Sequence, residues 1–129
     1  MSSPFRTWKG VEPYEFVPGV TLHAIGGEQL LMCRVNYAPG AVIPEHSHPE
    51  SEQLMYVVDG DVTLNVEGQS RTLGAGDVAV VNRGLKHDLF TVEGCTFIEA
   101  LAPVPRDHVP VPDRDLVLGA GGDALHVVS

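Results

Sequence analysis

Short apolar runs separated by turn signals make up most of the chain. The runs cover residues 20–25, 30–37, 42–45, 53–58, 62–66, 71–73, 78–81, 88–92 and 96–101. Turns rich in Gly, Asn and Asp recur about every 8 to 12 residues, a spacing typical of β-sandwiches and barrels. Valine is the commonest residue, and β-branched side chains suit a pleated, half-buried surface. The pattern predicts an all-β, antiparallel fold without helices.

The run over residues 62–66 alternates apolar and polar positions. Its apolar residues are predicted to face inward, whereas Thr63 and Asn65 are predicted to face water. Asp59-Gly60, just before this run, offers the positive φ that a tight hairpin requires. The sequence therefore predicts two strands, over 53–58 and 62–66, joined by a hairpin turn.

The composition of the chain changes after Leu101. Prolines at positions 103, 105, 110 and 112 remove backbone donors and interrupt any strand pairing. We expect an N-terminal arm over residues 1–19, a barrel over 20–102 and a C-terminal arm over 103–129 that packs on the barrel or on a partner subunit. Phe5 and Trp8 in the N-terminal arm indicate docking on a second copy, so a homodimer is expected.

Composition and charge disfavour several classes of partner. The chain has 129 residues, enough for one domain, and a net charge of −9 with only 8 basic residues. Nucleic acid and anionic membranes are therefore not expected as partners. Neither a membrane span nor a signal peptide is expected. Cys33 and Cys95 lie in strand-like runs and are predicted to be buried free thiols in a cytoplasmic protein.

The candidate chemistry begins at His46-Ser47-His48, which lies between Pro44 and Pro49. Residues two apart on an extended strand point to the same face, so both imidazoles are expected to enter one interior. Buried imidazoles need partners, and neutral imidazole is the commonest metal ligand. An H-x-H pair alone is weak evidence for a metal site, and its surroundings decide the interpretation.

Two spaced motifs surround these histidines. The first is Gly40, five residues, His46, one residue, His48, four residues, Gln53, six residues and Gly60. The second, separated from the first by the 15 residues 61–75, is Gly76, five residues, Asn82-Arg83-Gly84, two residues and His87. In these motifs and their separation, residues 20–101 resemble the cupin superfamily. The resemblance implies a single-domain jelly-roll β-barrel with a metal at the narrow end of its cavity.

The first motif departs from the family at one ligand. Cupins usually have a glutamate where this chain has Gln53, and Glu52 is one residue away. A one-residue offset on a strand sends a side chain to the opposite face. The Gln53 amide oxygen is therefore the expected ligand beside His46, His48 and His87, and Glu52 is expected to point outward unless a bulge redirects it.

Four neutral ligands would leave a divalent ion with its full charge. Such an ion polarises a substrate oxygen or acidifies bound water, so we predict a Lewis acid rather than an oxygen-activating redox centre. Zinc, nickel and ferrous iron suit this ligand set, and zinc is favoured.

Residues 40–107 look most like two groups of small cupins, which linearise unsaturated uronate sugars or cyclise aromatic polyketides. The resemblance places Glu99 in an acidic position and Arg106 in a basic one. The glutamate and the long tail favour the cyclase group. The implied activity is a metal-dependent, non-oxidative ring closure of aldol type with dehydration. In it Glu99 removes an α-proton and Arg106 binds a carboxylate or phenolate.

Other interpretations of these residues stay open. Glu99 would otherwise be a solvated strand end, and Arg106 a salt-bridge partner that fixes the tail. Met55 and Val57 share the face of Gln53 and are expected to line the substrate pocket, together with His23 unless that histidine is a satisfied core residue.

The alternative functions are uronate linearisation, a ferrous-iron dioxygenase and a small-molecule binding module. In each case the partner is a small molecule, either a carbonyl or enol compound or an anion.

Overall fold

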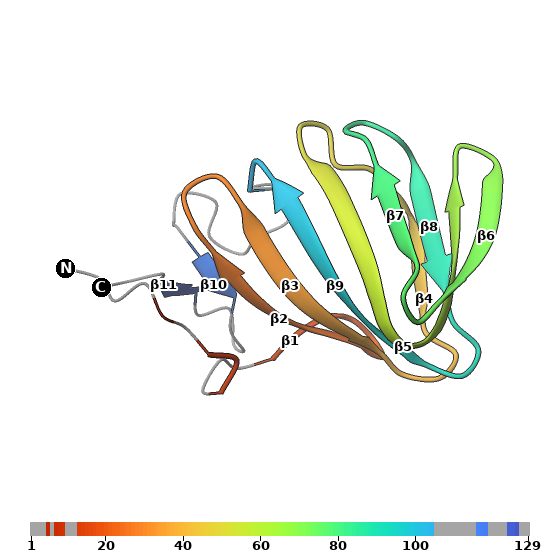
Figure 1. Ribbon diagram of the computed structural model, residues 1–129, viewed down its shortest axis with the longest axis horizontal. Coiled ribbons are helices and arrows are strands. Elements are labelled where there is room, and N and C mark those ends of the chain that lie inside the picture. Colours follow the sequence, from red (N-terminus) through yellow and green to blue (C-terminus); the bar gives the residue numbers. More distant parts are fainter. Residues whose placement is uncertain (1–4, 6, 10–12, 105–115, 119–123, 127–129) are drawn as a thin grey trace.

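The computed structural model describes residues 5, 7–9, 13–104, 116–118 and 124–126 of the chain (Figure 1). These residues contain strands and no helix, which confirms the all-β prediction. The strands are β1 (Tyr14–Val17), β2 (Val20–Gly26), β3 (Leu31–Tyr37), β4 (Val42–His46), β5 (Glu52–Val66), β6 (Gln69–Gly74), β7 (Val78–Val81), β8 (His87–Phe90), β9 (Cys95–Ala102), β10 (Leu116–Leu118) and β11 (Ala124–His126).

The strands from β1 to β9 form one antiparallel sheet. Its order is β1-β2-β3-β9-β5-β8-β4, with β6 and β7 also paired to β5. Side chains from β1 and β2 at one end of this order and from β4 and β8 at the other end line one cavity. The sheet therefore curls into a barrel, with β5 crossing its middle (Figure 1). The barrel encloses a cavity that is lined by strands from both ends of the sheet order.

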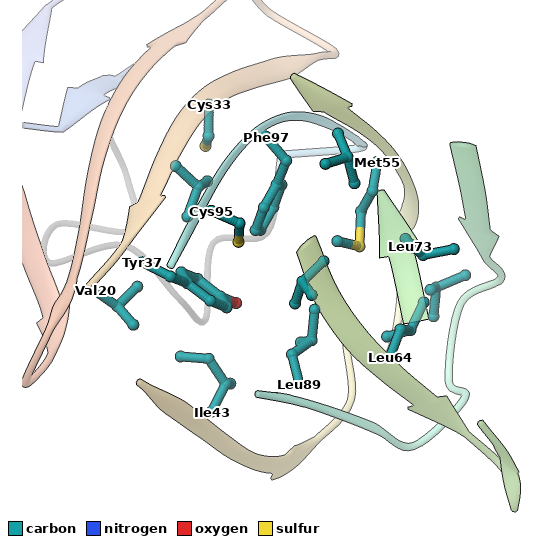
Figure 2. Close-up of a cluster of buried hydrophobic side chains, with 14 of the residues drawn as sticks. Val20, Cys33, Tyr37, Ile43, Met55, Leu64, Leu73, Leu89, Cys95 and Phe97 are labelled. Carbon is teal, nitrogen blue, oxygen red and sulfur yellow. The ribbon is translucent and has the colours of Figure 1, made fainter. Parts of the chain in front are cut away.

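The core follows the alternation of the strands. On β3, every second residue from Leu31 to Tyr37 is buried, and the inner positions of β5 and β9 show the same pattern. Tyr37 and Phe97 pack edge to face, with ring centroids 5.2 Å apart (Figure 2). Burial of each such apolar side chain contributes about 1.5–3 kcal/mol to stability. Cys33 and Cys95 are buried free thiols, as predicted.

The hairpin predicted at Asp59-Gly60 is wrong, because β5 runs unbroken through these residues. Its first half pairs with β7 and β9, and its second half pairs with β6 and β8. A register shift between Val57 and Asp59 marks the bulge where the strand bends. Gly60 has a φ of 75°, and a Cβ there would overlap the carbonyl oxygen of Gly94. The glycine thus permits two backbones to approach closely rather than reversing the chain.

Both predicted arms contain strands. Strand β1 pairs with β2, so part of the region 1–19 belongs to the main sheet. Strands β10 and β11 pair with each other, and β10 lies close to β2. The arm boundaries and the docking of the arms on a second copy stay predictions. No helix in the described residues is long and apolar enough to cross a bilayer.

Candidate metal centre

Three histidines meet at one end of the barrel. His46 ends β4, His87 begins β8, and the two residues pair directly across these antiparallel strands. His48 follows two residues after His46. One candidate ligand atom from each imidazole lies within 4.8 Å of the others, and His87 is completely buried. The structure therefore brings together three of the residues predicted as ligands, and the cluster could hold a metal ion.

Backbone carbonyls orient two of these rings. Nδ1 of His46 lies 2.8 Å from the carbonyl oxygen of Pro44, and Nδ1 of His87 lies 2.9 Å from that of Leu85. A carbonyl oxygen only accepts, so both Nδ1 atoms carry a proton, and in the neutral imidazole the lone pair is then on Nε2. Nε2 of His87 is buried without a hydrogen-bond partner in the described part of the chain. A buried lone pair left in this way is costly, and a cation would satisfy it.

Gln53 supplies an amide oxygen to the same cavity. It is the second residue of β5 and is buried on the inner face, whereas Glu52 is exposed on the outer face. The two side chains thus point to opposite faces of the strand, as the alternation predicts. Nε2 of Gln53 donates a hydrogen bond to Oε2 of Glu99 on β9, and Oε1 of Gln53 is buried without a partner among the described residues. This oxygen fits the role of a fourth neutral ligand.

Glu99 is the acidic group of the cavity. Burial raises the pKa of its carboxyl from the ordinary 4.5 to about 7, and the hydrogen bond from Gln53 opposes that rise. Burial, together with the charge of Glu99, also raises the pKa values of Tyr37 and Cys33, so the phenol and the thiol keep their protons at neutral pH. A carboxyl with a pKa near 7 can both take up and release a proton under these conditions.

The cavity has a volume of about 80 Å³ and two unlike parts. Its polar part consists of His46, His48, Gln53 and Glu99. The rest is mainly apolar side chains from β1, β2, β3, β4, β8 and β9, with the Tyr37 hydroxyl directed into the interior (Figure 2). No Lys or Arg is among the described residues that line it. The site thus combines a few convergent polar groups with an apolar wall, as is common in small-molecule sites.

Two of the residues expected to line the pocket lie in the core beside it. Met55 and Val57 are buried and share the inner face of β5 with Gln53, but neither lines the cavity. Each lies beside a cavity-lining residue of β9, because Glu99 pairs with Met55 and Phe97 pairs with Val57.

Two further predicted residues lie elsewhere. His23 is half-buried on β2, contacts the ring of Trp8 with centroids 6.5 Å apart and does not line the cavity. Arg106 lies outside the described residues, so its role stays a prediction.

Sequence reasoning missed Tyr37 and Phe97 as cavity residues. Tyr37 is in phase with Leu31 and Cys33 on β3, so the alternation places it on the inner face. The alternation does not show which inner side chains reach the cavity, since that depends on the pairing of β3 with β9.

Family comparison agrees with this architecture and with the motifs. A family model described as a cupin domain matches residues 33–98, just over half of the chain. The chain is a cupin. Because this family shares the barrel and the spaced histidines, the resemblance predicted from the two motifs is confirmed.

Curated relatives of this cupin include plant and bacterial proteins. It is 34% identical over 79 residues to Germin-like protein 5-1 of Oryza sativa subsp. japonica, covering 55% of this chain and 36% of that protein. It is 27% identical over 103 residues to the tetracenomycin polyketide synthase protein TcmJ of Streptomyces glaucescens, covering 73% of this chain and 69% of that protein. The cupin thus spans only about a third of the length of the germin-like relative.

Among solved structures, KdgF from Halomonas sp. has the same fold. Its TM-score is 0.76 at 24% identity, and the match covers 84% of this chain and 100% of that one. At this identity the likeness supports the fold alone.

Proposed function

We propose that this cupin is a metal-dependent, non-oxidative enzyme that acts on carbonyl or enol substrates, and that it closes the ring of an aromatic polyketide. One observation carries the proposal. Two imidazoles of the three-histidine cluster, those of His46 and His48, line the polar part of an otherwise apolar cavity together with the Gln53 amide and the Glu99 carboxyl, whose pKa is raised to about 7.

His46, His48, Gln53 and His87 would hold one divalent ion, with zinc favoured. Nε2 of His87 and Oε1 of Gln53 support this assignment, because both are buried without a hydrogen-bond partner in the described chain. The bound ion would supply Lewis-acid chemistry, polarising a ketone or enol oxygen. Imidazole and amide ligands leave its charge uncompensated, which strengthens that effect.

The carboxyl of Glu99 would act as the base. One of its oxygens accepts the hydrogen bond from Gln53, and the other oxygen can take a proton from the acidic carbon between two carbonyls. The resulting enolate carbon attacks a second carbonyl of the same substrate and forms the carbon–carbon bond that closes the ring. The protonated Glu99 returns its proton to the new alkoxide oxygen, and that hydroxyl then leaves with a neighbouring α-hydrogen as one water, which forms the ring double bond. The apolar wall, including Phe97 and Leu89, would hold the carbon body and exclude bulk water.

The mainly apolar lining of the cavity supports a polyketide, because aliphatic and aromatic side chains suit its carbon body. A uronate carries a carboxylate and several hydroxyls, and Arg106, the cation predicted to pair with a carboxylate, lies outside the described residues. A poly-carbonyl chain needs only a few polar contacts at its reacting end. The cavity is small at about 80 Å³, so a larger substrate would place its reacting carbonyls inside and extend beyond it. The similarity to TcmJ over about two-thirds of both chains supports the same choice.

The test combines metal analysis with turnover. Protein purified without an affinity tag is analysed for metals, and then incubated with a linear aromatic polyketide or with an unsaturated uronate. We expect one bound divalent ion per chain, a cyclised product formed with release of water, and no oxygen uptake. Oxygen consumption with bound ferrous iron would identify a dioxygenase, uronate turnover alone would identify the linearising activity, and binding without turnover would identify a binding module. Each of these results would overturn the proposal.

A further inference from the structure

The side chain of Gln53 has two ends of opposite character, and only one of them can be a metal ligand. Its amide oxygen accepts and can coordinate a cation, whereas its NH₂ group only donates. The two orientations are almost equal in shape, so packing alone does not select between them. A neighbouring group must do so if the oxygen is to face the cavity.

Glu99 is positioned to make this selection. Strands β5 and β9 pair Met55 with Glu99 and Gln53 with Leu101, which makes Gln53 and Glu99 diagonal neighbours on the inner face. Nε2 of Gln53 donates to Oε2 of Glu99, and Oε1 of Gln53 is then left buried without a protein partner among the described residues. While Glu99 is ionised, a rotated amide would set its oxygen against a carboxylate oxygen and lose the hydrogen bond, so the carboxylate form favours the observed orientation.

We infer that Glu99 is a positioning residue that fixes the Gln53 amide with its oxygen available to the metal. The inference rests on the proposed metal site and adds a second role to the carboxyl. Oε2 of Glu99 orients Gln53, and the other oxygen stays available for the proton transfer proposed above. Outer partners of metal ligands commonly change metal affinity by about 10–100-fold when they are removed.

The variants separate the two roles of the carboxyl. Glu99→Leu removes the acceptor at similar volume, whereas Glu99→Gln keeps an oxygen that can accept the bond from Gln53. Glu52→Leu is the matched control, because it makes the same substitution and the same charge change one strand position from Gln53, on the exposed outer face. Gln53→Ala and Gln53→Ala/Glu99→Leu complete a double-mutant cycle.

Zinc affinity is measured without substrate, by competition with a chromophoric chelator. We expect Glu99→Leu to weaken zinc binding about 10–100-fold and Glu52→Leu to stay close to wild type. Glu99→Gln should lie between the two, because its oxygen still accepts from Gln53 whereas its NH₂ can also pair with the rotated amide. In the Gln53→Ala background, Glu99→Leu should cause little further loss. Wild-type affinity in Glu99→Leu, or the same fold-loss with and without Gln53, would overturn the inference. A wild-type protein that binds no zinc, nickel or ferrous iron would instead overturn the proposed function.

A metal-free readout covers the case in which Glu99→Leu is destabilised. The side-chain NH₂ signals of Gln53 can be assigned in ¹⁵N spectra by their loss in Gln53→Ala. We expect these protons to be protected from exchange in the wild type and in Glu99→Gln, and to exchange rapidly in Glu99→Ala. Equal protection in Glu99→Ala and the wild type would contradict the positioning role.

Discussion

The histidine side and the glutamine side of the candidate centre are oriented by different kinds of partner. His46 and His87 are held by main-chain carbonyls two residues earlier in the chain. Gln53 is held by the side chain of Glu99, which is 46 residues away. A main-chain acceptor forms together with its own strand and survives any side-chain substitution. The orientation of Gln53 depends on the pairing of β5 with β9 and on the side chain of Glu99. A substitution at Glu99 can therefore change the glutamine side of the site, whereas no side-chain substitution removes the carbonyl acceptors of His46 and His87.

The largest effect is expected on the glutamine side, from Glu99→Gln on turnover. The amide cannot take the α-proton, so kcat should fall about 10²–10⁴-fold, the usual contribution of a general base. Zinc content should stay near one ion per chain, because Gln53 keeps its acceptor. Parallel measurement of kcat and bound zinc checks this, and an equal loss of both would make Glu99 purely structural and remove the proposed base.

On the histidine side, His87→Ala should weaken zinc binding by more than about 100-fold. The imidazole is completely buried, and removing a ligand should cost more than the 10–100-fold typical of outer partners. Gln53→Ala should cost less, because an amide oxygen is a weaker ligand than imidazole and water can replace it. Chelator competition on the two variants gives the ranking. A larger loss in Gln53→Ala would reverse the assignment of the histidines as the main ligands.

The difference between contacts within one segment and contacts between distant segments also explains which features could be predicted from the sequence. Strand alternation separates Gln53 from Glu52, because this relation needs only the local strand geometry. The predicted meeting of His46 and His48 is also observed, although β4 ends at His46 and His48 lies just beyond it. The buried positions of β3 and the short strand β7 also follow from local patterns. The contact between Gln53 and Glu99 could not be predicted, since it depends on the register of β5 against β9.

The errors have the same origin. Asp59-Gly60 has the local signature of a hairpin, but the approach of Gly94 to Gly60 makes it a bend within β5. Met55 and Val57 share the predicted face, yet only their neighbours on β9, Glu99 and Phe97, line the cavity. Both corrections concern contacts between distant parts of the chain, and local patterns in a single sequence do not reveal such contacts.

A moderate effect is expected from pH on the β9 side of the barrel. Burial, and then the negative charge of Asp61, raises the pKa of Cys95 from 9.0 to about 11. The unfolded thiol therefore loses its proton first as the pH rises, and Cys95 should lower the free energy of unfolding between pH 9 and 11 by less than about 1.4 kcal/mol per pH unit. Cys33 and Tyr37, whose pKa values are also raised, add to this loss. Urea unfolding across this range measures the slope, and Cys95→Ala should flatten it. An unchanged slope in the variant would assign the loss to other groups.

The smallest effect is expected from Pro44→Ala, which changes the residue whose carbonyl faces His46. Pro44 is exposed and lies where the pairing of β4 with β8 shifts register. The substitution keeps the carbonyl oxygen, so Nδ1 of His46 retains its acceptor and zinc affinity should stay within about twofold of the wild type, well below the roughly 10-fold expected for losing an outer partner. A loss of tenfold or more would mean that the proline ring, rather than the main chain of β4, sets the orientation of His46. The histidine side would then depend on a side chain as the glutamine side does, and the contrast between them would fail.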